Sequence, residues 1–300
     1  VNQRHPNPLD VKHYILAFSS FLIKYQLQYN LQDALRVTQL LSLSSRGVSV
    51  KILQELIHAD ARQLSEILLN LRQRAIAEEY VAYGVSCCRF LHPKLRELVY
   101  EQLTTYQRQE LHGQMAALLA DSTANPTELL CWEIAWHYEK MGQLEACLDF
   151  ELKALELETR WRCTPFVPWP KEREVSLESL EKAADRTLGR LMRLQQRQKR
   201  ELTSFCVRLD LIRGRISLFR GDWDQAVALL GNLTDSDSEQ RSLELAKICT
   251  LLAGGAYSRQ AAVLAERYVT AGLRFLKQQQ DDLTLARLYQ MRGNCFGLQG

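Results

Sequence analysis

The chain has few of the residues that interrupt helices and form tight turns. Its 300 residues include only 14 Gly and 7 Pro, roughly half of their usual share. This shortage argues against β architectures with many turns and favours helices. With 46% hydrophobic and 24% charged residues, the composition excludes a disordered chain. The length predicts either two domains or one solenoid.

The sequence also lacks the features of membrane, secreted and strongly charged proteins. Its net charge is only +3, so the overall charge gives no reason to expect nucleic acid or an anionic membrane as a partner. It contains no run of 18 apolar residues and no signal-peptide core. The eight cysteines include no CxxC pair and lie in apolar stretches, which is typical of reduced core thiols. We therefore expect a cytoplasmic protein without membrane contacts.

Motifs for catalysis and metal binding are absent from the sequence. It has no P-loop, no G-x-G-x-x-G and no G-x-S-x-G nucleophile elbow. The six histidines form no H-x-x-x-H or H-E-x-x-H pair, which argues against a zinc site. The alternating carboxylates Asp235, Asp237 and Glu239 lack the Gly and the distal Glu of a calcium loop. We expect neither catalysis nor a metal in this segment.

The first hundred residues predict three helices followed by a β-hairpin. Apolar residues recur at helical spacing in three stretches, and Asp60 is a suitable N-cap for the third. Two extended runs then flank a turn at Gly84. The predicted helices are 31–43, 50–58 and 61–74, and the predicted strands are 76–80 and 85–90. This order is that of a winged helix, and we expect no other β structure in the chain.

The chain after residue 92 is predicted to be helical except for a break at 161–171, and its last part contains an internal repeat. The motif Arg-Leu-x3-Arg-Gly-x6-Gly begins at Arg208 and again at Arg287, 79 residues later. We expect its first small residue to allow close helix packing and its second Gly to end the first helix of a hairpin. The expected packing residues are Gly214, Gly254 and Gly293, and the expected helix ends are Gly142 and Gly221. Such a period predicts a stacked α-solenoid of helical hairpins.

These hairpins resemble tetratricopeptide (TPR) repeats, which also place small residues at fixed positions, although the period here is near 40 instead of 34. The predicted fold is therefore mainly α. The predicted domains are an N-terminal helix or linker (1–30), a winged-helix-like domain (31–104), first helical hairpins (105–160), a Pro- and Trp-rich loop (161–172) and TPR-like repeats (173–300). Within the first hairpins, the predicted helix 127–140 follows Asn125 as N-cap, with Pro126 in its first turn.

The region after the β-hairpin resembles a segment of STAND-class signal-transduction ATPases. The chain reads F-x-H-x-x-L-R-x-x-V-Y over 90–100 and R-x-x-L-H over 108–112, as that class does. The A-x-H-Y stretch from Ala135 is similar to the first helical repeat of the class. The matching residues are Phe90, His92, Leu95, Arg96, Tyr100, Arg108 and His112. Arg108 is also expected to pair with Glu101 or with the carbonyls that end the preceding helix.

In these bacterial regulators, a P-loop ATPase module precedes a winged helix and TPR-like repeats. The resemblance implies a non-catalytic regulatory segment whose repeats bind a protein or small-molecule effector and bias a nucleotide-dependent switch. It implies that ATP or ADP is bound by a preceding module, with no cofactor in this segment, and that His92 contacts the nucleotide phosphates. His92 and His112 are alternatively ordinary structural histidines. Because the chain begins at Val1 and stops at Gly300, where a turn would open, we expect a piece of a longer protein.

One helix carries a basic stripe that suggests a second kind of partner. Its members, spaced four or three residues apart, are Arg186, Arg190, Arg193, Arg197 and Arg200. The stripe is either a solvated or internally paired face, or a docking strip for an acidic partner or a phosphate backbone.

Two alternative functions remain open. The first is a stand-alone adaptor whose repeats bind a peptide on their concave face. The second is a transcription regulator that reads DNA with the 61–74 helix. DNA is the less expected partner, because basic residues are few in that helix and Glu66 lies among them.

Overall fold

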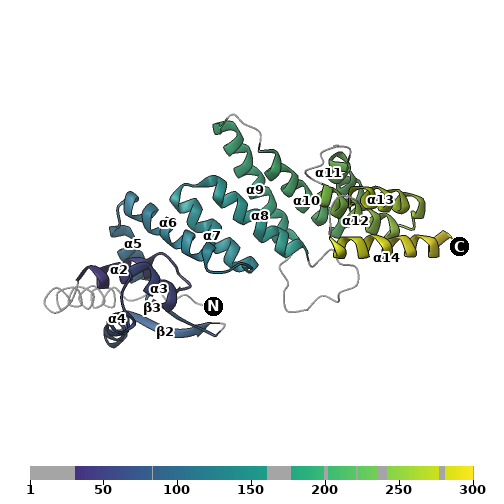
Figure 1. Ribbon diagram of the computed structural model, residues 1–300. Coiled ribbons are helices and arrows are strands. Elements are labelled where there is room, and N and C mark those ends of the chain that lie inside the picture. The colour runs from purple at the N-terminus through teal and green to yellow at the C-terminus, as the bar shows by residue number, and fades with distance from the viewer. Residues whose placement is uncertain are drawn as a thin grey trace, which may run out of the picture. The chain divides into compact units, whose positions relative to one another are not determined.

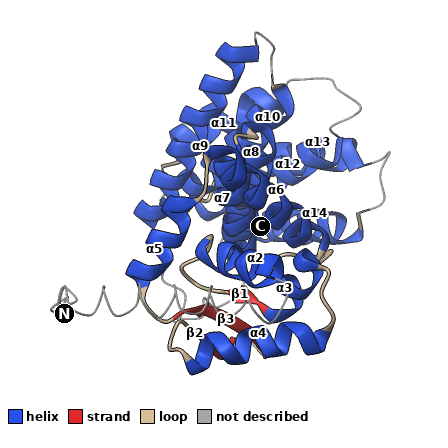
Figure 2. Cartoon of the chain, turned by 90° about the vertical axis from the view of Figure 1, so that its left-hand side faces the viewer, coloured by secondary structure: helices blue, strands red, loops and turns tan. Residues whose placement is uncertain are grey.

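The computed structural model describes residues 31–82, 84–160, 177–198, 202–220, 222–234, 242–276 and 281–299. Within these ranges the chain has 13 helices and one three-stranded antiparallel sheet (Figures 1 and 2), which confirms the prediction of a mainly helical fold. The predicted linker 1–30 and the loop 161–172 lie outside the described residues. No helix in the described part of the chain is both long and apolar enough to cross a membrane.

The described chain divides into two compact units, and the boundary crosses one helix. The first unit is Val1–Pro126 with Trp136–Gln143, and the second is Thr127–Ala135 with Leu144–Gly300.

The first unit begins with the three predicted helices and the predicted hairpin. The elements are α2 (Leu31–Ser42), β1 (Val48–Ser49), α3 (Val50–Ile57), α4 (Ala61–Gln73), β2 (Ala77–Ala82) and β3 (Val85–Phe90). Asp60 caps α4 as predicted, because its Oδ1 accepts a hydrogen bond of 2.8 Å from the backbone N–H of Gln63.

The expectation that the β structure is confined to this hairpin was wrong. The short strand β1 pairs with β3, Val48 opposite Cys88, and gives the strand order β1-β3-β2 (Figure 2). Gly47 allows this pairing: its φ is +95°, and a Cβ there would lie 2.8 Å from the carbonyl oxygen of Cys88. Two residues are too few to show a strand periodicity in the sequence.

Four helices follow the hairpin. They are α5 (Pro93–Gln102), α6 (Thr105–Asp121), α7 (Glu128–Met141) and α8 (Leu144–Arg160). The prediction of Asn125 as the N-cap of the third was wrong, because α7 begins only at Glu128. Thr127 caps it instead: its hydroxyl accepts from the N–H of Leu130 and its carbonyl from that of Cys131.

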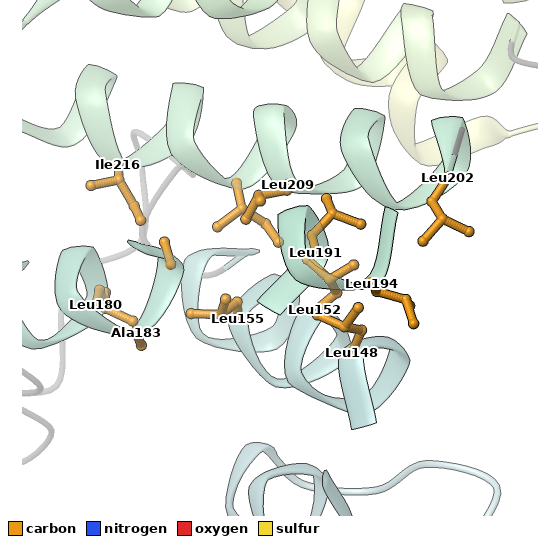
Figure 3. Close-up of a cluster of buried hydrophobic side chains, with 12 residues drawn as sticks. Leu148, Leu152, Leu155, Leu180, Ala183, Leu191, Leu194, Leu202, Leu209 and Ile216 are labelled. Atoms are coloured by element: carbon orange, nitrogen blue, oxygen red, sulfur yellow. The ribbon is translucent and has the colours of Figure 1, made fainter. Parts of the chain in front are cut away.

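The second unit contains the C-terminal helices. They are α9 (Leu177–Gln198), α10 (Thr203–Arg220), α11 (Trp223–Thr234), α12 (Ser242–Ser258), α13 (Ala262–Leu276) and α14 (Asp282–Gln299). Its largest apolar cluster joins α8, α9 and α10 (Figure 3). Leu152, Leu191 and Leu209, one from each helix, are buried in this cluster.

The hairpin turns α7–α8, α10–α11 and α12–α13 share one backbone hydrogen bond. In each, an N–H donates to the carbonyl five residues earlier: Gln143 to Tyr138, Asp222 to Ser217 and Ala261 to Ala256, at 2.9–3.0 Å. Such a bond is typical of a Schellman turn, in which the residue just before the donor is left-handed. Gly142 (φ +88°) and Gln260 (φ +60°) fill that position in the first and third turns, whereas Gly221 lies outside the described residues.

The turns also fix the register of the repeat. Asp222 and Ala261 are equivalent and 39 residues apart, so Gly214 corresponds to Ala253 and not to Gly254. At Gly214 the expected close packing is present, since a Cβ would lie 2.4 Å from Leu230 Cγ. At Gly254 and Gly293 that prediction was wrong, because the nearest atom would lie 4.0 Å from a Cβ at Gly254 and no atom would lie within 4 Å of a Cβ at Gly293. The neighbouring Gly255 makes the close contact instead, with the Trp223 ring.

Candidate functional site

Two buried histidines meet in the first unit, one from α6 and one from α7. His112 and His137 are 0% and 1% exposed, and their Nδ1 atoms lie 2.8 Å apart. A hydrogen bond between two ring nitrogens needs one N–H donor and one unprotonated acceptor. One of the two Nδ1 atoms therefore carries a proton and donates it in a hydrogen bond to the other. Both side chains are buried from solvent.

Tyr100, at the end of α5, extends this contact to a third helix. Its hydroxyl lies 3.2 Å from His112 Nε2, and the edge of the Trp136 ring packs on the His112 ring with centroids 5.0 Å apart. Arg108 holds the end of α5 in place: its Nε donates to the Tyr100 carbonyl at 3.1 Å and its Nη2 to the Glu101 carbonyl at 2.9 Å. The sequence predicted this role of Arg108 as one of two alternatives.

We call Tyr100, Arg108, His112, Trp136 and His137 the histidine cluster. Burial is the main reason that the pKa of His112 falls to about 4, and the positive charges of Lys140 and Arg108 lower it further. Burial also lowers the pKa of His137 to about 3, with His112 as the second cause. Both rings are therefore neutral at pH 7. A buried neutral pair suits the fixing of helix positions and not proton exchange with a substrate.

The other residues of the motif over 90–112 lie in the same compact unit. Phe90 and Leu95 are buried core residues. Arg96 Nη1 donates to the carbonyl of Ser42 at 3.2 Å, which ties α5 to the end of α2. His92 is the half-buried N-cap residue of α5, two helical turns before Tyr100. It therefore lies at the opposite end of α5 from the histidine cluster.

The predicted basic stripe is not one continuous surface. Arg190 turns to α8 and forms an ion pair with Glu151, which is only 5% exposed and also accepts a hydrogen bond from Thr187. Arg186, Arg193 and Arg197 are exposed on α9. Arg200 lies outside the described residues. The internally paired alternative therefore applies to Arg190, and a smaller surface of three arginines remains.

The sequence singled out Arg208 only as part of the repeat, and the structure gives it a contact role. Its Nε donates to Glu156 at 2.6 Å, and its Nη1 pairs with Asp149 on the same face of α8. Arg208 thus joins α10 to α8 across the apolar cluster of the second unit. The seven-residue spacing of the two carboxylates is the only signal in the sequence for this ion-pair network.

Metal sites and comparisons with known proteins add no further indication of function. No group of three His, Cys, Asp or Glu able to hold a metal ion occurs among the described residues. No protein family, curated protein or solved structure matches the chain.

Proposed function

We propose that the chain is the non-catalytic regulatory segment of a STAND-type signalling ATPase. In this proposal a winged-helix-like domain transmits the nucleotide state of a preceding ATPase module. TPR-like helical hairpins bind a partner protein or effector and bias the switch between a closed, ADP-held form and an open one. The residues of the chain itself do no chemistry.

The histidine cluster is the observation that carries this proposal. Residues that the sequence matched to the class one by one, Tyr100, Arg108 and His112, contact each other and the following His137. The cluster links α5, which packs on α2 and β3 of the small domain, to the helices α6 and α7. A chain of packed and hydrogen-bonded side chains of this kind can carry a switch between a domain and the helices after it.

The acidic charge of the hairpin favours this function over DNA binding. Glu78 and Glu79 lie on β2, and Arg89 on β3 is paired with Glu78 at 2.7 Å. On α4, Arg62 is paired with Glu66 at 3.3 Å. A duplex backbone is bound by clustered, available cations. The small domain is therefore proposed as a packing unit and not as a reader of DNA.

His92 is the proposed contact to nucleotide. It lies where β3 enters α5, a connection fixed by the hydrogen bond of 2.9 Å from Leu91 N–H to the Ile76 carbonyl. In a closed form, a phosphate oxygen would accept a hydrogen bond from its ring. That contact would slow ADP release.

The experiment is ADP release from the protein of the complete reading frame, followed with a fluorescent ADP analogue. We expect His92→Ala to accelerate release at least tenfold and the neighbouring Lys94→Ala to leave it unchanged, since Lys94 is exposed and its ammonium is paired with Glu97 on the same helix. Equal release rates for wild type and His92→Ala would contradict the proposed contact. Failure of the complete protein to bind nucleotide would contradict the proposed function, and would leave the stand-alone adaptor.

A further inference from the structure

Helix α9 has one side buried in the second unit and another side that carries arginines. Leu180, Leu191 and Leu194 are buried in the apolar cluster that joins α9 to α8 and α10 (Figure 3). These two helices are the neighbours of α9 along the chain, and both already pack on its buried side. The exposed side is therefore not a surface that the next helix of the repeat would cover.

Three arginines form a row on the exposed side of α9. Arg186, Arg193 and Arg197 are exposed, and positions i, i+7 and i+11 lie on one side of a helix, over about 16 Å of its axis. Lys182, on the same side, is paired with Glu178 at 2.6 Å. In the described part of the chain, none of the three arginines forms an ion pair with a carboxylate. Their guanidinium groups are therefore available to an anionic partner.

Gly189 lies between Arg186 and Arg193 in this row, and no packing contact among the described residues requires a glycine there. It lies inside a helix of 22 residues, where glycine lowers helix stability, and a Cβ would meet no atom within 4 Å. Its carbonyl accepts a hydrogen bond of 3.1 Å from Arg193 Nε, which holds that guanidinium along the helix. Departures from helix propensity are expected at functional positions, and a missing side chain lets a partner approach the backbone closely.

The residues on the other side of Gly189 favour a peptide as the partner. Met192 is 55% exposed and Asp185 is exposed; at i+3 and i−4 both are neighbours of Gly189 on the helix surface. A phosphate backbone carries a charge at every nucleotide, so it would meet repulsion at Asp185 and make no apolar contact with Met192. A peptide can place carboxylates at the arginines and an aliphatic side chain on the Met192 thioether.

We propose that Arg186, Gly189, Met192, Arg193 and Arg197, here called the arginine face, form a docking surface for an acidic segment of a partner protein. Each guanidinium can donate two parallel hydrogen bonds to one carboxylate. An aliphatic side chain of the segment would lie over Gly189 and against Met192. The proposal rests on the protein-binding part of the proposed function and names the chemistry of the partner.

A fluorescein-labelled peptide of glutamates and leucines, EELEELEELEE, is a defined probe for the arginine face. We expect saturable binding to the 300-residue chain in fluorescence anisotropy at low ionic strength. Added salt should weaken the binding, because exposed charges are screened. A peptide with glycine in place of each leucine should bind at least threefold more weakly, since it loses the contact with Met192. Absence of saturable binding would overturn the proposal.

Substitutions in the chain locate the binding. Arg186→Gln/Arg193→Gln should weaken it at least tenfold, whereas Arg287→Gln/Arg292→Gln removes the same charge from exposed positions of α14 and should bind like wild type. Gly189→Gln should weaken binding at least threefold without lowering the Tm, because its Cβ enters open space and glutamine is the better helix former. Equal weakening by the two double variants, or unchanged binding by Gly189→Gln, would overturn the proposal.

A fluorescein-labelled DNA duplex is tested on the same variants. Binding of the duplex that is tighter than that of the peptide and is lost in Arg186→Gln/Arg193→Gln would overturn the proposal and assign the arginine face to a phosphate backbone. Tighter binding of the peptide supports the proposal. Because none of these measurements involves ATP or ADP, their failure is distinguishable from failure of the proposed ATPase context, which is tested by ADP release.

Discussion

The Nδ1 atoms of His112 and His137 face each other at 2.8 Å, buried between α6 and α7. This contact couples the two hydrogen bonds of His112: the role of its Nδ1 as donor or acceptor sets the opposite role for its Nε2. If His112 donates from Nδ1, its Nε2 accepts from the Tyr100 hydroxyl; if it accepts at Nδ1, its Nε2–H donates to that hydroxyl. His112 is neutral in both arrangements, and protonation of both histidines would place two donors against each other.

The chain should therefore lose stability in mild acid. The pKa values of His112 and His137 are about 4 and about 3 in the folded chain, below the ordinary value of 6.5. At pH values between the folded and the ordinary pKa, the unfolded chain binds more protons than the folded chain does. The free energy of unfolding therefore falls as the pH drops from about 6.5 to 4. We expect a loss of a few kcal/mol in urea unfolding curves. The double variant His112→Leu/His137→Leu should show a flatter profile, and an unchanged slope would refute the role of the pair.

Removal of the Tyr100 hydroxyl should destabilise the cluster without changing its shape. Tyr100→Phe leaves His112 Nε2 buried without its partner at 3.2 Å, which costs about 1–3 kcal/mol. Tyr106→Phe is the control, since Tyr106 is 74% exposed and should change stability little. Equal stability of the two variants in chemical denaturation would show that the Tyr100 hydroxyl contributes nothing.

The two internal glycines Gly214 and Gly254 should respond in opposite ways to alanine. Gly214→Ala forces a Cβ against Leu230 and should cost about 1–3 kcal/mol. Gly254→Ala in α12, where a Cβ would lie 4.0 Å from Met291 Cε in an ordinary contact, should gain up to about 1 kcal/mol from helix propensity. A double-mutant cycle of Gly214→Ala with Leu230→Ala should show coupling, because the shorter side chain relieves the clash. Equal destabilisation by both glycine variants would contradict the register.

The left-handed residues of the hairpin turns offer a test of the repeated turn geometry. Gln260 has φ +60°, where a side chain costs energy and glycine does not. Gln260→Gly should stabilise the chain by roughly 0.5–1 kcal/mol, and Gly142→Gln should destabilise it by roughly 1–2 kcal/mol. Opposite shifts of the Tm are expected, and shifts of the same sign would argue against equivalent turns.

Local chemistry made much of the fold predictable. The Asp60 cap, the hairpin turn at Gly84 and the repeated Gly142 turn each depend on one residue type at one backbone position. Contacts across elements were less accessible. The strand β1 depends on the close approach of Gly47 to β3, and the small residue nearest Trp223 is Gly255, one residue from the position that the glycine spacing suggested.

The site residues show the same division. The motif singled out His112, whereas His137 appeared only as the His of the A-x-H-Y stretch. The sequence did not predict that the two side chains meet, because 25 residues separate them. In the sequence Arg190 is one of five similar arginines, but in the structure its place on α9 brings it against α8, where it pairs with the buried Glu151. Which member of a stripe turns inward depends on the helix packed against it, and a single sequence does not specify that neighbour.

The most direct test of the proposed function is the sequence of the reading frame upstream of Val1, over about 300 codons. The proposed function predicts a P-loop of the form G-x-x-x-x-G-K-[ST], which would hold the phosphates near His92, followed by an acidic strand. A stop codon directly upstream, or a preceding module without a P-loop, would contradict it.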